Sequence, residues 1–152
     1  MVLEKKRIIH EEAATEIKEG PTKGKYDSWM IARPNEKEDG LEHVHQSVLS
    51  ANMGERLLEL HIDDGLLSMT SLLGPGTIPL PIKIGDYIPF EKLLWNVHRE
   101  IADDAVSEKS IETMKKLIDW HSSIDEEILS EFKTRKPKIK ELEKILEDYN
   151  VG

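Results

Sequence analysis

The sequence predicts an α+β fold in which an N-terminal helix and a small antiparallel sheet precede three C-terminal helices, one of them long. Hydrophobic periodicity supports this prediction. Apolar residues recur at helical spacing in 1–19, alternate with polar residues between 24 and 84, and return to helical spacing after residue 89. A run of strands followed by a run of helices is typical of this class. We expect one domain over 1–152, with an α/β part to about residue 88 and a helical part over 89–150.

Residues 1–19 are expected to form the first helix. Its apolar positions are four residues apart: Ile9, Ala13 and Ile17. The dipeptide Gly20-Pro21 would end this helix. The following segment KYDSWMIARP, residues 25–34, has the bulky apolar residues and the terminal proline of a strand.

The middle of the chain predicts further strands. Residues 42–50 alternate between the two faces of a strand, although a helix through 41–60 remains an alternative. Residues 56–73 read as a β-hairpin, because Asp63-Asp64-Gly65 is a favourable turn between two apolar segments. Prolines and glycines in 74–89 exclude a helix and a central strand, so we expect an extended edge segment there.

Three amphipathic helices are expected in the C-terminal half. The first starts near Pro89 and continues to about residue 101. Ser107 is a plausible N-cap for a long helix over 108–134. Pro137 should break that helix and begin the last, short one.

Composition and charge restrict the classes of function. The chain contains no cysteine, which excludes disulfides, thiolate nucleophiles and cysteine-ligated metals. A net charge of -9 argues against general binding to nucleic acid, since phosphate repels an acidic surface. No apolar stretch approaches the length of a membrane span or a signal peptide. We therefore expect a soluble protein of the cytoplasm, without a membrane partner.

One alternative function is that of a metal-dependent enzyme or a metal-binding protein. Its candidate ligands cluster around the predicted hairpin: His43, His45, His61 and Asp63. His43 and His45 would point to one face of a strand, which lets two imidazoles converge on an ion. The His-x-His pair and the later histidine resemble the metal sites of cupins. No glutamate follows His45 at the spacing of that family, and the C-terminal third is helical, so the family is not assigned. The other reading is a polar hairpin with surface histidines.

Two histidines on the predicted helices form a second candidate. His121 and Asp125 are four residues apart and would face each other on one helix, and His98 lies on the apolar stripe of the helix before. If these helices pack antiparallel, both histidines approach one interface. A carboxylate beside an imidazole could create a general base, or it could form a structural hydrogen bond.

A basic segment offers a third alternative, binding of nucleic acid. KTRKPKIK, residues 133–140, carries five basic residues: Lys133, Arg135, Lys136, Lys138 and Lys140. The preceding segment 100–131 carries ten acidic residues against three lysines. A helix with a basic end explains this charge pattern without a ligand, so nucleic acid is an unlikely partner.

Interaction with protein is the function that the sequence favours. No nucleophile elbow, phosphate loop or cofactor motif is present, so we expect a non-enzymatic interaction or assembly module with no implied cofactor. The predicted long helix is apolar on more than one side and must be covered from two directions. A second copy of the chain could cover it, which would make the protein a homo-oligomer. The expected interface residues are Ile111, Met114, Ile118, His121, Ile128 and Phe132.

Overall fold

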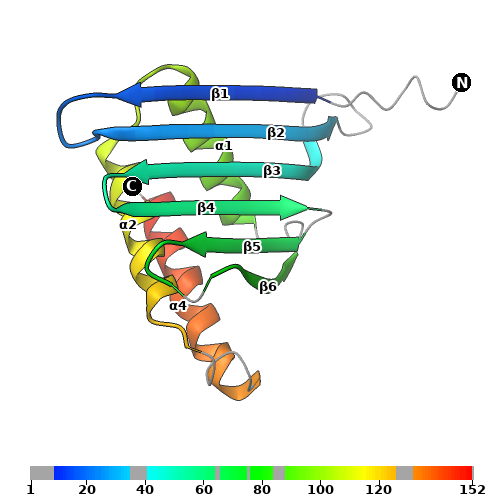
Figure 1. Cartoon of the computed structure of the whole chain (residues 1–152). Helices are drawn as coiled ribbons and strands as arrows, with labels where there is room; N and C mark the ends of the chain where they lie inside the picture. The colour runs from blue at the N-terminus through cyan, green and yellow to red at the C-terminus, as the bar shows by residue number, and fades with distance from the viewer. Residues whose placement is uncertain are drawn as a thin grey trace, which may run out of the picture.

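The computed structural model describes residues 9–34, 41–63, 66–74, 76–83, 88–125 and 132–151. These residues form two layers, a six-stranded antiparallel sheet and a layer of helices against one of its faces (Figure 1). The strands are β1 (Ile9–Ile17), β2 (Gly24–Pro34), β3 (Leu41–Met53), β4 (Arg56–Asp63), β5 (Leu66–Ser71) and β6 (Ile78–Lys83). The described helices are α1 (Ile88–Ala102), α2 (Glu108–Ser122) and α4 (Phe132–Val151). We call the side of the sheet opposite these helices the open face.

The strands lie in the order of the sequence, and each pairs antiparallel with the next. Helix α1 packs on β1, β2 and β3, whereas α2 packs on β4 and β5. Helix α4 contacts α1 and α2 and lies over the helical layer at the lower end of the sheet (Figure 1). One face of the sheet is therefore covered by helices that follow it in the chain.

The core lies between the two layers. Alternate residues of each strand point into it, as expected for an antiparallel sheet with one buried face. In β2, for example, Tyr26, Ser28 and Met30 are buried whereas Trp29 is only half-buried. The largest fully buried side chains come from both layers: Tyr26, Met30, Leu49, Leu58, Leu60, Ile62, Met69, Leu93, Leu94, Ile101 and Met114.

The predicted N-terminal helix is wrong, because residues 9–17 form strand β1. β1 pairs with β2 from Ile9↔Ala32 to Ile17↔Gly24. Positions four apart lie on one face of a strand as well as on one face of a helix, so the spacing of Ala13 and Ile17 fits both. The Gly20-Pro21 pair lies in the β1–β2 turn. A charged outer strand also protects the sheet edge from pairing with other chains.

The other strand predictions are confirmed. Residues 41–53 form β3, which settles the choice between helix and strand for this segment. The predicted hairpin is formed by β4 and β5, which pair from Leu58↔Ser71 to Asp63↔Leu66. The proline-containing segment is β6, and it lies at the edge of the sheet as expected.

The helix boundaries differ from the prediction in two places. Ser107 is the N-cap of α2, as expected, and its hydroxyl accepts a hydrogen bond from the amide of Ser110. α2 ends at Ser122, however, because the hydroxyls of Ser122 and Ser123 bind the carbonyls of Asp119 and Trp120. Pro137 lies inside α4 and does not begin it.

The described helices are amphipathic. None of them is long and apolar enough to cross a membrane. The apolar sides of α1 and α2 pack on the sheet, whereas α4 packs on α1 and α2. Trp120 of α2 also donates a hydrogen bond of 2.8 Å to the carbonyl of Lys138 in α4. This bond helps to fix the position of α4 over α2.

Candidate functional site

The open face is built from cross-strand rows of side chains. One row crosses its middle and joins five strands: Glu12, Trp29, Val48, His61 and Ser68. A second row lies beside it: His10, Ile31, Gln46, Asp63 and Leu66. Side chains in such rows are close enough to form a continuous surface.

Trp29 is the largest side chain on the open face. Its ring meets the ring of His10 edge to face, with a centroid distance of 6.2 Å. Ile31 and Val48 flank Trp29, and all three apolar side chains are half-buried. Leu66 extends the second row and is 56% exposed. These residues leave an apolar centre on a face that no described helix covers.

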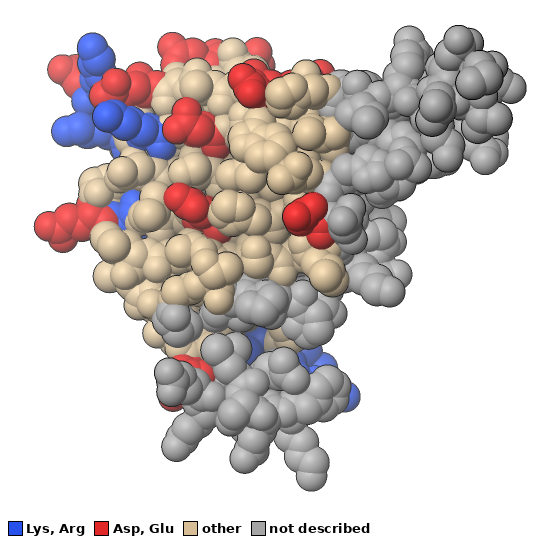
Figure 2. Space-filling model, turned by 45° about the vertical axis from the view of Figure 1, so that its right-hand side comes forward, with Lys and Arg blue, Asp and Glu red and all other residues tan. Residues whose placement is uncertain are grey.

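Acidic side chains lie near this centre on three strands. The described side chains of the open face include five carboxylates against a single lysine, Lys25. The acidic residues are Glu12, Glu16, Asp27, Glu59 and Asp63. Figure 2 shows separate acidic groups on a largely uncharged surface, with basic groups gathered at one edge of the view. The open face is therefore negative in potential around an apolar middle.

A hollow of about 290 Å³ opens on this face beside Val48 and His61. Its polar lining includes Gln46, Asp63, Ser68 and Thr77. The Nε2 atom of His61 lies 3.2 Å from a carboxylate oxygen of Glu59, on the same strand. The hydroxyl of Thr77 is 2.6 Å from that of Thr70. The lining of this hollow thus combines the carboxylate of Asp63 with several neutral polar groups.

A larger hollow of about 540 Å³ lies at the other end of the sheet, between the β1–β2 and β3–β4 turns. Lys18, Lys23 and Lys25 line it together with Glu16. Lys25 is also the cross-strand neighbour of Glu16. Exposed lysines beside turns are usually solvated groups without a ligand. The larger volume of this hollow therefore does not make it a better candidate for a binding site than the hollow beside His61.

The structure brings together only part of the predicted metal site. His61 and Asp63 lie on the same face of β4 and both line the smaller hollow. His43 and His45 belong to β3, but their side chains lie outside the described residues. In the described part of the chain, no group of three histidine or acidic side chains could hold a metal ion. Metal binding at the predicted residues remains a prediction.

The predicted interface residues of the helices occupy the core of the single chain. Ile111, Met114, Ile118 and His121 are buried in α2 against the sheet. Ile128 and the side chain of Phe132 lie outside the described residues. Within the described part, the stripe on α2 is therefore covered by the chain itself.

The predicted nucleic-acid residues lie on α4. Lys136 and Lys140 are exposed, whereas Lys138 contacts the hydroxyl of Ser123 at 2.9 Å and a carboxylate oxygen of Glu141 at 3.2 Å. The side chains of Lys133 and Arg135 lie outside the described residues. A contact with nucleic acid at this segment remains a prediction.

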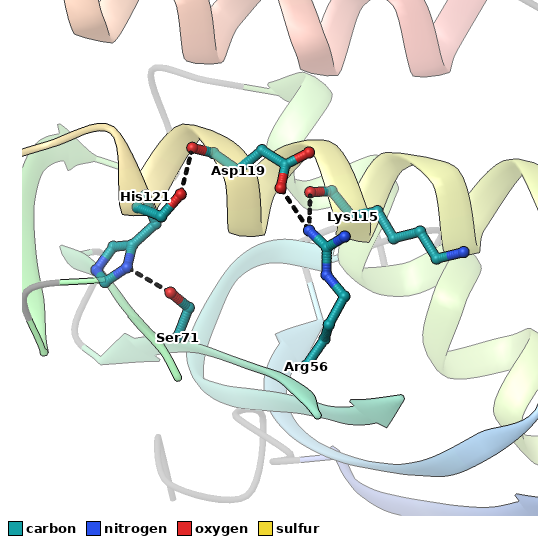
Figure 3. A network of polar contacts seen from close by, with 6 residues as sticks. Arg56, Ser71, Lys115, Asp119 and His121 are labelled. Atoms are coloured by element: carbon teal, nitrogen blue, oxygen red, sulfur yellow. Dashed lines mark hydrogen bonds and ion pairs between the residues drawn. The ribbon is translucent and has the colours of Figure 1, made fainter. Parts of the chain in front are cut away.

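The two buried histidines lie apart and each binds a serine of the sheet. His98 Nδ1 is 2.6 Å from Ser28 Oγ, and His98 Nε2 is 3.4 Å from a carboxylate oxygen of Glu11. His121 Nδ1 is 2.7 Å from Ser71 Oγ (Figure 3). The expectation that His121 and Asp125 lie on one helix is wrong, because α2 ends at Ser122.

The burial of these serine–histidine pairs indicates a structural role. Ser28 and His98 are 3% and 5% exposed, and His121 is fully buried, so a substrate has no access to them. Desolvation lowers the pKa of both histidines, although Glu11 partly opposes this effect at His98. The neutral imidazoles act as structural hydrogen-bonding groups between the layers. The serines were missed because polar residues at core positions of a strand become visible only once the facing helix is known.

Comparisons with protein-family models, curated protein sequences and solved structures found no significant match. The open face combines an apolar centre, a negative surround and a polar hollow.

Proposed function

We propose that this chain is a non-enzymatic protein-interaction module whose partner binds the open face of the sheet. The observation that carries this proposal is the apolar centre around Trp29, which has carboxylates near it on β1, β2 and β4. Half-exposed tryptophan is enriched at protein interfaces, because its large ring supplies apolar area and a polar N–H. The absence of cysteine suits the cytoplasm as its compartment.

A partner with basic residues fits the open face better than a second copy of the chain does. Each copy has five carboxylates and one lysine among the described side chains of its open face. An interface between two open faces would therefore contain ten carboxylates and only two of these lysines. Like charges that face each other across an interface are strongly unfavourable. A partner that presents lysines or arginines around an apolar side chain would match both the charge and the centre.

The area of the open face is adequate for such a partner. Five strands are spaced by about 4.8 Å, and eight residues of a strand extend over roughly 27 Å. The side chains above this rectangle expose more area than its projection. The face therefore approaches the surface of about 800 Å² per partner that stable interfaces bury.

The burial of the polar pairs supports a role without catalysis. Both serine–histidine pairs lie in the core, with Ser71 4% exposed and His121 fully buried. A nucleophile and its base must reach a substrate to act. The accessible surface instead offers the groups that bind another protein.

Selection from a random peptide library displayed on phage would test the proposal. The wild-type chain serves as bait, and enriched peptides are then tested against Trp29→Glu. The matched control is Asn96→Glu, which adds the same charge at an exposed position on α1. We expect enriched peptides to combine lysine or arginine with a bulky apolar residue, and to lose at least about tenfold in affinity with Trp29→Glu but not with Asn96→Glu.

Two results would contradict the proposal. One is that no peptide is enriched, and the other is that the enriched peptides bind Trp29→Glu as well as they bind the wild type. Light scattering with size-exclusion chromatography supplies a further check. A dimer that persists in Trp29→Glu would favour self-association through other surfaces, including the predicted helical one.

A further inference from the structure

We propose that the hollow beside His61 receives the guanidinium group of an arginine from the partner, an inference that rests on the proposed function. The hollow lies on the open face next to Val48, which is the cross-strand neighbour of both Trp29 and His61. A side chain of the partner can therefore enter the hollow while neighbouring residues cover Trp29.

The charge of the hollow favours a cation. Asp63 is exposed, and among the described residues it forms no ion pair with a lysine or arginine. Its cross-strand neighbours Gln46 and Leu66 are uncharged. The carboxylate of Glu59, in contrast, is already engaged by His61 at 3.2 Å. Asp63 is thus the group whose charge a partner would neutralise.

The polar lining suits a guanidinium group better than an ammonium group. The amide oxygen of Gln46, the carboxylate of Asp63 and the hydroxyl of Ser68 are acceptors on three neighbouring strands. A guanidinium group donates five N–H bonds in a fixed plane and can satisfy acceptors in several directions at once. The methylene groups of the arginine would lie against Val48, as long cationic side chains commonly do on apolar surface.

The volume of the hollow is suited to a single side chain of a partner. Its volume of about 290 Å³ is just below the range of pockets for drug-sized ligands, about 300–1,000 Å³. A whole nucleotide or coenzyme would extend beyond it. A single anchoring side chain at such a hollow is a common way to fix the position of a partner on a flat surface.

A double-mutant cycle tests this inference with the peptides obtained on the open face. Each arginine or lysine of a Trp29-dependent peptide is changed to alanine, and the dissociation constants for the wild type and for Asp63→Asn are measured by calorimetry. Asp27→Asn is the matched control, because it removes the same charge from the open face away from the hollow. For one arginine of the peptide, we expect the change to alanine to weaken binding to the wild type about fivefold more than it weakens binding to Asp63→Asn. With Asp27→Asn, the same change should weaken binding as much as it does with the wild type.

The outcomes separate this inference from the proposed function. A coupling below threefold at every basic residue of the peptide overturns the arginine site, while binding that depends on Trp29 leaves the proposed function intact. The absence of any Trp29-dependent peptide overturns both. Native mass spectrometry with added Zn²⁺ gives a further outcome. A zinc ion bound to the wild type and lost from Asp63→Asn would assign the hollow to a metal and overturn the arginine site.

Discussion

Ser71 Oγ lies 2.7 Å from His121 Nδ1, and this hydrogen bond joins β5 to α2 inside the core (Figure 3). Desolvation lowers the pKa of His121 from 6.5, and the carbonyls of Gly76 and Met69 only partly oppose this effect. The chain folds with a neutral imidazole at this position. The bond between Ser28 and His98 repeats the arrangement at the other end of the helical layer, between β2 and α1.

The first prediction concerns stability against pH. Both folded-state pKa values lie below the unfolded value of 6.5, so the unfolded chain binds more protons as the pH falls below that value. The stability contributed by the neutral histidines is present above pH 6.5 and is lost as the pH falls toward the folded pKa values. Urea unfolding between pH 7.5 and 5.5 should therefore show a falling midpoint.

The matched variants for this experiment are His98→Gln and His121→Gln, with His10→Gln as the exposed control. We expect the double variant of the buried histidines to reduce the pH dependence and the control to leave it unchanged. The ion pair of Arg56 with Asp119, two residues before His121 on α2, is present in every variant. An unaltered pH dependence in the double variant would show that other groups cause it.

The second prediction concerns Gly74, which packs directly on the imidazole of His121. A Cβ atom at residue 74 would overlap with His121 Nδ1, so Gly74→Ala must displace a fully buried ring. We expect a loss of about 2 kcal/mol or more in the free energy of unfolding. The same change made together with His121→Ala should cost much less, because the ring is then absent. If Gly74→Ala lowers the free energy of unfolding equally in the wild type and in His121→Ala, the loss does not come from a clash with the imidazole.

The third prediction compares two buried serines on neighbouring strands. In the described part of the chain, the hydroxyl of Ser47 has no hydrogen-bond partner, whereas that of Ser28 binds His98. Ser47→Ala removes an unsatisfied group and should raise the free energy of unfolding by about 1 kcal/mol. Ser28→Ala should lower it by about 1–3 kcal/mol, because His98 Nδ1 loses its partner. Thermal unfolding of both variants measures the difference, and equal shifts would contradict the assignment.

The fourth prediction concerns the contact of Arg56 with α2. Its guanidinium donates to a carboxylate oxygen of Asp119 at 2.5 Å and to the carbonyl of Lys115 at 3.2 Å (Figure 3). Both bonds start from the same atom, Nη2, and a lysine keeps the charge but is one bond shorter, so its ammonium reaches these acceptors less well. Arg56→Lys should therefore lower the free energy of unfolding by up to about 1 kcal/mol. Asp119→Asn should cost less, since the Asp119 side chain is 69% exposed. A larger loss for Asp119→Asn would show that the charge pair dominates.

The sequence predicted the parts of the fold in which local signals agree. The alternating pattern of β4 and β5, the prolines of β6 and the N-cap at Ser107 each favour one local structure, and each prediction is confirmed. β1 was mistaken for a helix because Ala13 and Ile17 suit both periods and the pairing with β2 decides between them. The end of α2 was missed because Ser122 and Ser123 compete for carbonyls, an effect that apolar spacing does not show.

The candidate site was less predictable than the fold. His61 and Asp63 were selected from the sequence as metal ligands, and the structure places both at the hollow on the open face. Trp29 was recognised only as a strand residue, because its neighbours Val48 and His10 come from other strands. The sidedness of a sheet follows from strand register, which a single sequence specifies only weakly.

The sheet is synthesised before the helices that cover it. Every strand precedes every described helix, so the ribosome releases the sheet before the residues that cover its apolar face. About 70 residues separate the end of β6 from the end of α4, which corresponds to roughly 4–14 s of translation. During that interval Leu49, Leu60 and Met69 lack the helical layer that buries them in the finished protein. The nascent sheet therefore exposes an apolar face for several seconds, and we expect a chain terminated before α1 to aggregate.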